Sequence, residues 1–214
     1  MGTDDTKQRL LDAVVHTLVH DGIAGVSART IGNRAEVNPA LIYYHFGNLD
    51  GLLVAAATQV SQQRAEVYRQ RLTHVTSLGE LATVARELHH EDREQGNLAM
   101  LTQLFAGTRT HPELAPALNE NFRIFQQEVA RTIERLTAGT AVAEVIPTAQ
   151  LAWLISAGFV GIELLDTVTH EDEAALFDSL ETVSELVDQL LEAGAITSAI
   201  VRRRIRRTPR SPRR

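Results

Sequence analysis

Apolar side chains recur at helical spacing along almost the whole chain, and no stretch alternates in the way that a half-buried strand does. The clearest stripe lies near the N-terminus and consists of Leu10, Leu11, Val14, Val15, Leu18 and Val19. Aromatic residues, which favour strands, make up only 5% of the 214 residues. The sequence therefore predicts an all-α fold.

Residues that start or stop a helix divide the N-terminal part into short segments. A first helix over 4–20 should end at Gly22, because glycine readily adopts the left-handed conformation needed there. Ser27 can then cap a second helix, since its hydroxyl can accept a hydrogen bond from a free backbone N–H. Ile31 and Ala35 lie four residues apart on that helix, so both should face inward.

A tight turn separates this second helix from a third. The break falls at Glu36, after which Asn38 can cap a helix over about 39–45. Pro39 suits the first position of that helix, because its missing N–H would have no helical partner there. Asn48 follows the end of the third helix and opens a fourth.

Two short helices joined by a tight turn form a helix-turn-helix, whose second helix enters the major groove of DNA. Ile42 and Phe46, four residues apart and apolar, should face the core. Ala40, Leu41 and Tyr44 then lie on the opposite face, which is the face offered to base edges. The pattern therefore predicts a DNA-binding unit.

The N-terminal residues also carry a family signature over about 8–54. The residues concerned are Gly22-Ile23-Ala24-Gly25-Val26-Ser27, Ile31, Ala35, Val37, Asn38-Pro39-Ala40-Leu41-Ile42-Tyr43-Tyr44-His45-Phe46-Gly47-Asn48 and Leu52-Leu53. This pattern resembles the N-terminal signature of the tetracycline-repressor (TetR) family of transcriptional regulators. The family commonly has Lys at the position of Leu49 and Gly at that of Glu36, so one phosphate contact and the turn geometry differ here.

The resemblance implies a role in DNA binding for individual residues. Ser27, Tyr43 and His45 would contact phosphates, and the helix begun at Asn48 would direct its N-terminus at another phosphate. The DNA-binding set expected from the capping, the geometry and the resemblance together is Ser27, Arg29, Asn38, Pro39, Ala40, Leu41, Tyr43, Tyr44, His45 and Asn48.

The expected reading surface is apolar and poor in positive charge. Ala40 and Leu41 can contact thymine methyl groups, and no arginine is present there to read guanine, so specificity should depend on thymine contacts and DNA shape. Residues 1–50 carry four basic and six acidic residues, which predicts a shallow salt dependence of DNA binding. Arg29 and Arg34 lie on the second helix.

The remainder reads as amphipathic helices over 49–73, 78–94, 97–109, 112–137, 148–168 and 172–193. We expect three parts: a three-helix DNA-binding domain over 1–50, a helical ligand-binding and dimerisation domain over 51–200, and a tail over 201–214. The tail carries eight arginines and no acid, so the net charge of −6 becomes −14 on residues 1–200. Blocks of like charge repel, which predicts a disordered tail that could contact DNA.

The last two expected helices carry the features of a helix–helix interface. Leu176, Leu180, Val183, Val187 and Leu190 follow a 4-3-4-3 spacing, and Ala157, Gly158 and Gly161 form a small-residue patch. The resemblance implies that 148–168 and 172–193 form a four-helix dimer interface with a second copy. An intramolecular bundle is the alternative.

The middle helices carry large apolar side chains that could line a pocket for a largely apolar small molecule. The resemblance places a ligand there, among Met100, Leu101, Leu104, Phe105, Phe122, Phe125 and Trp153, with Phe159 nearby. Candidate polar members of this pocket are Gln103, Arg109, Asn121, Gln126 and Glu163. The same spacing is more often that of an ordinary core.

Other classes of function find little support. The chain has no cysteine, and His89-His90-Glu91-Asp92 are adjacent residues that point apart on a helix, so we expect neither a metal site nor a cofactor. There is no Ser-His-Asp arrangement, carboxylate pair or phosphate-binding glycine loop, so we expect no enzyme. No signal peptide is evident, and the apolar run 151–162 is too short for a membrane span, so we expect a cytoplasmic protein.

These patterns predict a dimeric transcriptional repressor that binds a palindromic operator in double-stranded DNA and is released by a small molecule. The sequence does not name the ligand, the operator or the sign of regulation. The alternative is a DNA-binding or protein-interaction module without a small-molecule ligand, which the absence of ligand-dependent release would reveal.

Overall fold

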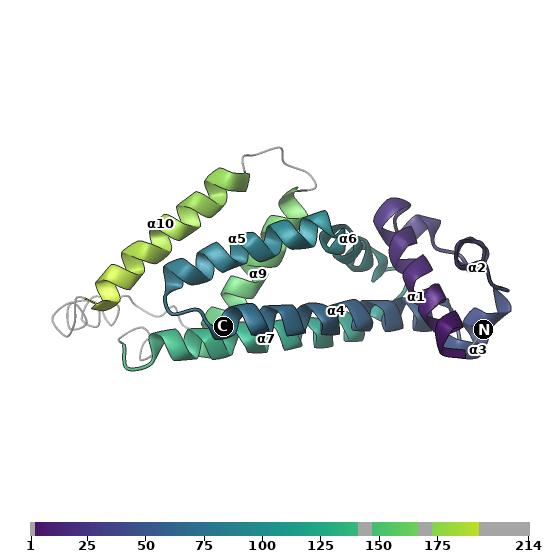
Figure 1. Cartoon of the computed structure of the whole chain (residues 1–214), viewed down its shortest axis with the longest axis horizontal. Coiled ribbons are helices and arrows are strands. Elements are labelled where there is room, and N and C mark those ends of the chain that lie inside the picture. The colour runs from purple at the N-terminus through teal and green to yellow at the C-terminus, as the bar shows by residue number, and fades with distance from the viewer. Residues whose placement is uncertain (1–2, 141–146, 167–172, 193–214) are drawn as a thin grey trace, which may run out of the picture. The chain divides into compact units, whose positions relative to one another are not determined.

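Every element of the computed structural model is a helix within residues 3–140, 147–166 and 173–192, which are the residues that the structure describes (Figure 1). In chain order the elements are α1 (Thr3–His20), a short 3₁₀ helix (Ile23–Gly25), α2 (Ala28–Ala35), α3 (Ala40–Phe46), α4 (Leu49–Thr73), α5 (Leu78–Glu94), α6 (Asn97–Gly107), α7 (Leu114–Thr137), α9 (Thr148–Asp166) and α10 (Glu173–Glu192). The prediction of an all-α fold is confirmed.

The predicted helix limits agree with the observed ones to within about two residues. The fourth helix begins at Leu49 and ends at Thr73, as expected. The predicted segments 97–109 and 112–137 were too long where they meet, because the chain turns between Gly107 and Leu114. In this turn the backbone N–H groups of Thr110 and His111 both donate to the carbonyl of Gly107.

The chain divides into two compact units. The first unit consists of residues 1–68 and 88–125, and the second consists of residues 69–87 and 126–214. The predicted domain boundary near residue 50 stays a prediction, and the arginine-rich tail over 201–214 lies outside the described residues.

One buried apolar cluster holds the first unit together. It draws fully buried side chains from α1, α2, α3, α4, α6 and α7, among them Leu10, Val14, Leu18, Ile31, Ile42, Leu52, Leu53, Leu104 and Leu114. Each such side chain contributes about 1.5–3 kcal/mol by leaving water. The predicted inward positions Ile31 and Ala35 are confirmed, since their exposed fractions are 0% and 4%.

Helix α6 lies close to the end of α1. The backbone N–H of Ile23, just after α1, donates to Oε1 of Gln103 at 3.0 Å. A Cβ placed on Gly96 would lie 3.0 Å from Cγ1 of Val19, and one on Gly107 would lie 3.0 Å from Cγ1 of Ile23. Glycine at both positions therefore permits a close approach between helices.

In the second unit, polar contacts and the buried ring of Phe177 join α10 to α5. The carboxylate of Asp188 accepts hydrogen bonds from the backbone N–H groups of Leu78 and Gly79, at 3.0 and 2.8 Å. The guanidinium of Arg86 lies 2.6 Å from Asp178 and also lies over the ring of Phe177, which is buried.

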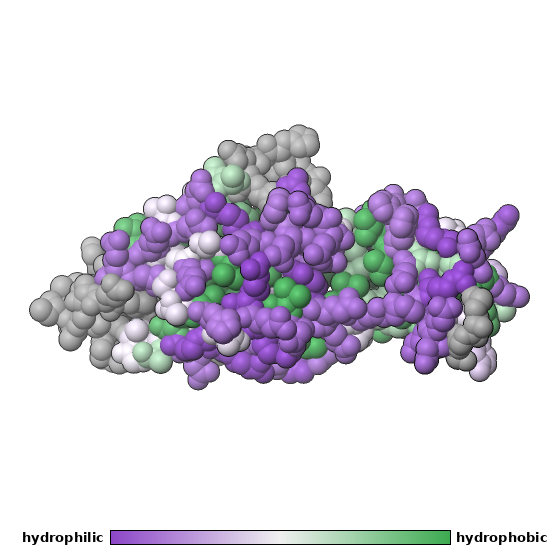
Figure 2. Space-filling view, in the orientation of Figure 1, coloured by the Kyte–Doolittle hydropathy of each residue, from purple (hydrophilic) through white to green (hydrophobic). Residues whose placement is uncertain are grey.

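Hydrophilic residues dominate the visible face of the molecule, with hydrophobic patches between them (Figure 2). Within the described residues, no helix is long and apolar enough to cross a membrane.

Candidate nucleic-acid interface

Helix α2 begins at the predicted cap. Ser27 has extended backbone geometry, and its hydroxyl oxygen accepts a hydrogen bond from the backbone N–H of Thr30 at 3.1 Å. The same hydroxyl lies 2.7 Å from that of Thr30. Ser27 is half-buried, so its side chain serves first as a helix cap.

The turn between α2 and α3 is tight and uses one left-handed residue. Glu36 has φ 53° and ψ 42°, and its carboxylate lies 3.2 Å from the guanidinium of Arg9 on α1. The backbone N–H of Val37 donates to the carbonyl of Gly32 at 2.9 Å. A Cβ on Gly32 would lie 2.6 Å from Cγ of Pro39, so α2 and the start of α3 touch here.

Helix α3 is short and anchored on one side. Oδ1 of Asn38 accepts a hydrogen bond from the backbone N–H of Ala40 at 2.9 Å, as a capping side chain does. The helix begins at Ala40, so Pro39 lies at the N-cap, one position before the predicted one. Ile42 is fully buried, and Phe46 packs against the core cluster, so the predicted inward face is confirmed. Gly47, with φ 78°, ends the helix.

The opposite face of α3 presents aromatic side chains to solvent. The exposed fraction of Tyr44 is 76% and that of Tyr43 is 57%, and Ala40 is exposed as well. Leu41 differs from expectation, because it is half-buried against the core cluster and offers only part of its surface. His45 is half-buried, and its ring meets that of Tyr44 edge-on at 4.9 Å.

Helix α4 begins beside the end of α3. Oδ1 of Asn48 accepts a hydrogen bond from the backbone N–H of Gly51 at 2.7 Å, which caps the helix. In the first turn, Oδ1 of Asp50 lies 2.5 Å from Nδ1 of His111. The Asn48 side chain is exposed, so an anion can approach the start of α4.

The two arginines of α2 differ in their surroundings. The guanidinium of Arg34 lies 3.0 Å from the carboxylate of Asp21 and also donates to the hydroxyl of Thr17, so its charge is largely offset within the protein. Arg29 is exposed and has no ion pair among the described residues. Of the two, Arg29 is therefore the one available to a phosphate group.

The residues predicted to form a ligand pocket fall into different surroundings. Met100 and Leu104 belong to the buried core cluster of the first unit, and Leu101 and Phe105 pack against it. Half-buried Phe122 and Phe125 lie 6.4 Å apart between ring centroids, also in the first unit. Trp153 belongs to the second unit and is 56% exposed. A pocket formed by this set stays a prediction.

The candidate polar members of that pocket are also dispersed. Gln103 is engaged with the backbone of Ile23, and Arg109 is exposed. Nδ2 of Asn121 is buried without a hydrogen-bond partner, whereas the side chain of Glu163 lies outside the described residues. In the described part of the chain, no group of three or more His, Asp or Glu side chains is placed to hold a metal ion.

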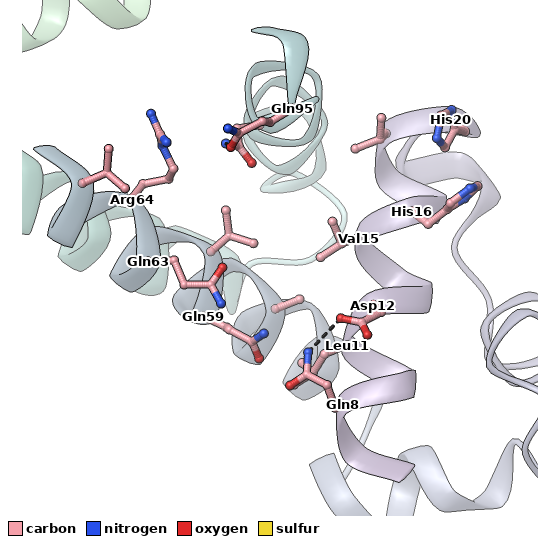
Figure 3. A pocket seen from close by; sticks show the side chains of 15 residues that line it. Gln8, Leu11, Asp12, Val15, His16, His20, Gln59, Gln63, Arg64 and Gln95 are labelled. Atoms are coloured by element: carbon pink, nitrogen blue, oxygen red, sulfur yellow. Dashed lines mark hydrogen bonds between the residues drawn. The ribbon is translucent and has the colours of Figure 1, made fainter. Parts of the chain in front are cut away.

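Sequence reasoning missed a groove of about 620 Å³ between α1 and α4. It is lined by Gln8, Leu11, Asp12, Val15, His16, Val19, His20, Ala56, Gln59, Val60, Gln63, Arg64, Val67, Gln95 and Asn97. Figure 3 shows the side chains of α1 and α4 that face one another across it. The sequence did carry a signal for this groove: on both α1 and α4, the lining residues form a second helical stripe beside the buried apolar one.

Helices α9 and α10 carry apolar side chains that remain exposed. The exposed residues are Trp153, Leu154, Leu176, Leu180, Val183 and Leu186. A Cβ on Gly158 or Gly161 would meet nothing within 4 Å, so the small-residue patch of α9 is open. The side chain of Leu190 lies outside the described residues.

Comparison with known proteins gives the same picture for the N-terminal residues. Residues 10–56 match the family described as bacterial regulatory proteins of the tetR family. The nicotine-responsive transcriptional repressor HdnoR of Paenarthrobacter nicotinovorans is 36% identical over 63 residues, which are 29% of this chain and 32% of that protein. The chain spans between 28% and 59% of the length of the curated relatives it matches.

Similarity to solved structures extends over most of the chain. A Rhodococcus protein described as a TetR-family transcriptional regulator superposes with a TM-score of 0.69 at 22% identity, covering 84% of this chain and 98% of that one. The multidrug binding protein EbrR, complexed with imidazole, gives a TM-score of 0.61 at 28% identity, covering 83% and 94%. An N-terminal helix-turn-helix followed by a helical C-terminal part is therefore the fold of this chain.

Proposed function

We propose that this chain, whose residues 10–56 match the tetR family of bacterial regulatory proteins, is a dimeric transcriptional repressor of that family. In this proposal it binds a palindromic operator in double-stranded DNA and is released when a small molecule binds. It has no catalytic role and acts in the bacterial cytoplasm, where the chromosome is accessible.

The exposed aromatic face of α3 is the observation that supports DNA binding most directly. A helix of seven residues is anchored by buried Ile42 while Tyr43 and Tyr44 stand in solvent. Large exposed aromatic side chains on a rigid, capped helix have no role in the core. They suit a surface that contacts base edges and phosphates in the major groove.

The contacts proposed for individual residues follow from their exposure. Tyr44 and Ala40 contact bases, whereas Tyr43 and Arg29 contact phosphates on either side of the groove. Ser27, Asn38 and Asn48 direct helix N-termini towards the backbone, and His45, Pro39 and partly buried Leu41 complete the surface.

The exposed apolar residues of α9 and α10 support dimerisation. A single reading helix contacts a short site, and strong binding requires a second copy on a half-site roughly 34–36 Å away. The apolar stripe from Leu176 to Leu186 and the open patch at Gly158 and Gly161 are surfaces that a second copy could cover. A two-fold dimer would read a palindromic operator.

Relatives whose names state a ligand support a response to a small molecule. HdnoR is nicotine-responsive by name, and EbrR is a multidrug binding protein by title. The ligand would act by binding more tightly to a conformation whose two reading helices have the wrong spacing for the operator. Equal affinity for both conformations would release nothing.

Fluorescence anisotropy on DNA that flanks the chain's own coding region tests this function. The titration is run at several salt concentrations against a scrambled duplex of the same length. Tight, sequence-dependent binding with a shallow salt slope supports the proposal, because few cations face the DNA. Equal and weak binding to both duplexes contradicts it.

A further inference from the structure

The groove between α1 and α4 contains none of the residues proposed to contact DNA. It lies wholly within the first unit, between residues 8–20 of α1 and residues 56–67 of α4, with the turn from α5 to α6 also contributing. Its volume of about 620 Å³ falls within the roughly 300–1,000 Å³ typical of small-molecule sites.

The lining combines an apolar floor with neutral polar groups. Leu11, Val15 and Val60 supply aliphatic surface, and the side-chain amides of Gln59 and Gln63 stand one helical turn apart on α4. Figure 3 shows these two amides on the side of α4 that faces α1. A ligand with an apolar body and few polar groups matches this lining.

The charged residues of the lining differ in whether their charge is already paired within the protein. Nε of Arg64 lies 2.6 Å from Oδ1 of Asp92, whose side chain is 2% exposed, so the positive charge of Arg64 is offset by a buried partner. Asp12 is exposed and accepts a hydrogen bond from the neutral amide of Gln8 at 2.7 Å. Among the described residues, no cation lies within ion-pair distance of Asp12, so the groove offers an uncompensated negative charge.

We propose that this groove binds an amphipathic organic monocation, whose apolar body covers the aliphatic floor and whose charge lies beside Asp12. The histidines of the lining do not oppose this arrangement, because Figure 3 shows His16 and His20 pointing away from α4. Binding itself requires no DNA. Its regulatory consequence rests on the proposed function.

That consequence follows from the two walls of the groove. One wall is α1, whose end is linked to α2 through the Arg34–Asp21 ion pair, and the other is α4, which begins directly after α3. A ligand that contacts both walls favours one arrangement of the DNA-reading helices relative to α4. By linkage, the factor by which the cation changes DNA affinity equals the factor by which DNA changes cation affinity.

The experiment uses two ions of the same shape and opposite charge, tetraphenylphosphonium and tetraphenylborate. Isothermal titration calorimetry of the full chain in sodium buffer, at about pH 8 where free imidazole is neutral, measures each affinity without DNA. We expect tetraphenylphosphonium to bind once per chain and more tightly than tetraphenylborate. Asp12→Asn should weaken tetraphenylphosphonium binding about two- to fivefold, as expected for an ion pair with an exposed carboxylate.

Asp5→Asn is the matched control, because Asp5 is exposed on the same helix but does not line the groove. It changes the net charge equally and should leave the affinity for tetraphenylphosphonium unchanged. Gln63→Trp should weaken binding of the cation by filling the groove. Equal affinity for both ions, or equal sensitivity to Asp12→Asn and Asp5→Asn, overturns the proposal.

The anisotropy titration keeps this inference separate from the proposed function. Suppose that tetraphenylphosphonium binds in an Asp12-dependent way but the chain does not bind the DNA that flanks its coding region. The proposed ligand site in the groove is then supported, and the proposed repressor function is contradicted. If the chain binds operator DNA but tetraphenylphosphonium does not bind, or binds without regard to Asp12, the proposed ligand site alone is contradicted.

Discussion

Glu36 shows how one residue can carry the strain of a functional turn. Among the described residues it is the one non-glycine residue with positive φ, at 53°. A left-handed conformation costs a side-chain-bearing residue about 1–2 kcal/mol. The family resemblance places glycine at this position, so the turn geometry persists here despite a less suitable residue.

Replacing Glu36 by glycine should therefore stabilise the protein. We expect Glu36→Gly to raise the free energy of unfolding by about 0.5–1 kcal/mol, less than the full strain because glycine also gains freedom in the unfolded chain. Denaturant unfolding measures this. Glu36→Gln is the control: it removes the ion pair with Arg9 but keeps the strain, and should change stability by less than about 0.5 kcal/mol. A destabilised glycine variant would contradict the argument.

Tyr44 offers a test of DNA recognition that leaves the core untouched. Because 76% of its surface is exposed, Tyr44→Ala should leave the melting temperature unchanged. It should lower affinity for the operator about tenfold or more, since a good base contact is worth roughly 1–3 kcal/mol. Anisotropy with Tyr44→Phe in parallel separates the hydroxyl from the ring. Unaltered affinity in Tyr44→Ala would remove α3 from the base-reading role.

At the level of elements, helices and caps were predictable because their signals are local. Ser27 caps α2, and Asn38 accepts a hydrogen bond from the N–H at the start of α3, since a capping side chain and its N–H partner lie within three residues. Long-range partners were not predictable. Gln103 was expected in a ligand pocket, yet it binds the backbone of Ile23, eighty residues away in the chain. Helical periodicity gives the face of a helix but not its partner.

The contact between α2 and α3 should be sensitive to a single methyl group. A Cβ on Gly32 would lie 2.6 Å from Cγ of Pro39, so Gly32→Ala should cost about 1–3 kcal/mol of stability and also weaken DNA binding. The double variant Gly32→Ala with Pro39→Ala removes the clashing ring. If the loss in the double variant is as large as in Gly32→Ala, the clash is not the cause.

A buried ion pair links α4 to α5 within the first unit. Asp92 is 1% exposed, pairs with Arg64, and accepts hydrogen bonds from the Tyr68 hydroxyl and from Nδ2 of Asn97. Asp92→Asn should lower the free energy of unfolding by about 3 kcal/mol, because it removes the near carboxylate of a buried guanidinium and leaves Arg64 only Glu91, at 4.0 Å.

The matched control for this change is Asp178→Asn on α10. The side chain of Asp178 is 67% exposed, although it also lies 2.6 Å from an arginine, so the change should cost under about 1 kcal/mol. Denaturant unfolding compares the two variants. Equal losses would mean that burial does not determine the strength of these pairs.

For the whole molecule, the proposed dimer depends on the exposed apolar residues of α9 and α10. Val183 is 58% exposed, so Val183→Glu should leave the fold of the chain intact but bury an unpaired charge in a dimer. We expect sedimentation velocity to show a monomer where the unaltered chain sediments as a dimer. Gln189→Glu adds the same charge beside the stripe and should keep the dimer. A dimeric Val183→Glu variant would place the interface elsewhere.

The position of α6 determines whether helices α1–α4 could be transferred to another protein and still fold. Leu104 and Met100 of α6 belong to the cluster formed with α1, α2, α3 and α4, as do Leu114 and Leu118 at the start of α7. The side chain of Gln103 accepts a hydrogen bond from the backbone N–H of Ile23, just after α1. A chain cut after residue 56 would lose this cover and expose apolar surface. The helices proposed to read DNA therefore share their core with α6 and the start of α7, and we expect a chimaera that takes α1–α4 alone to be unstable unless it also takes these later segments.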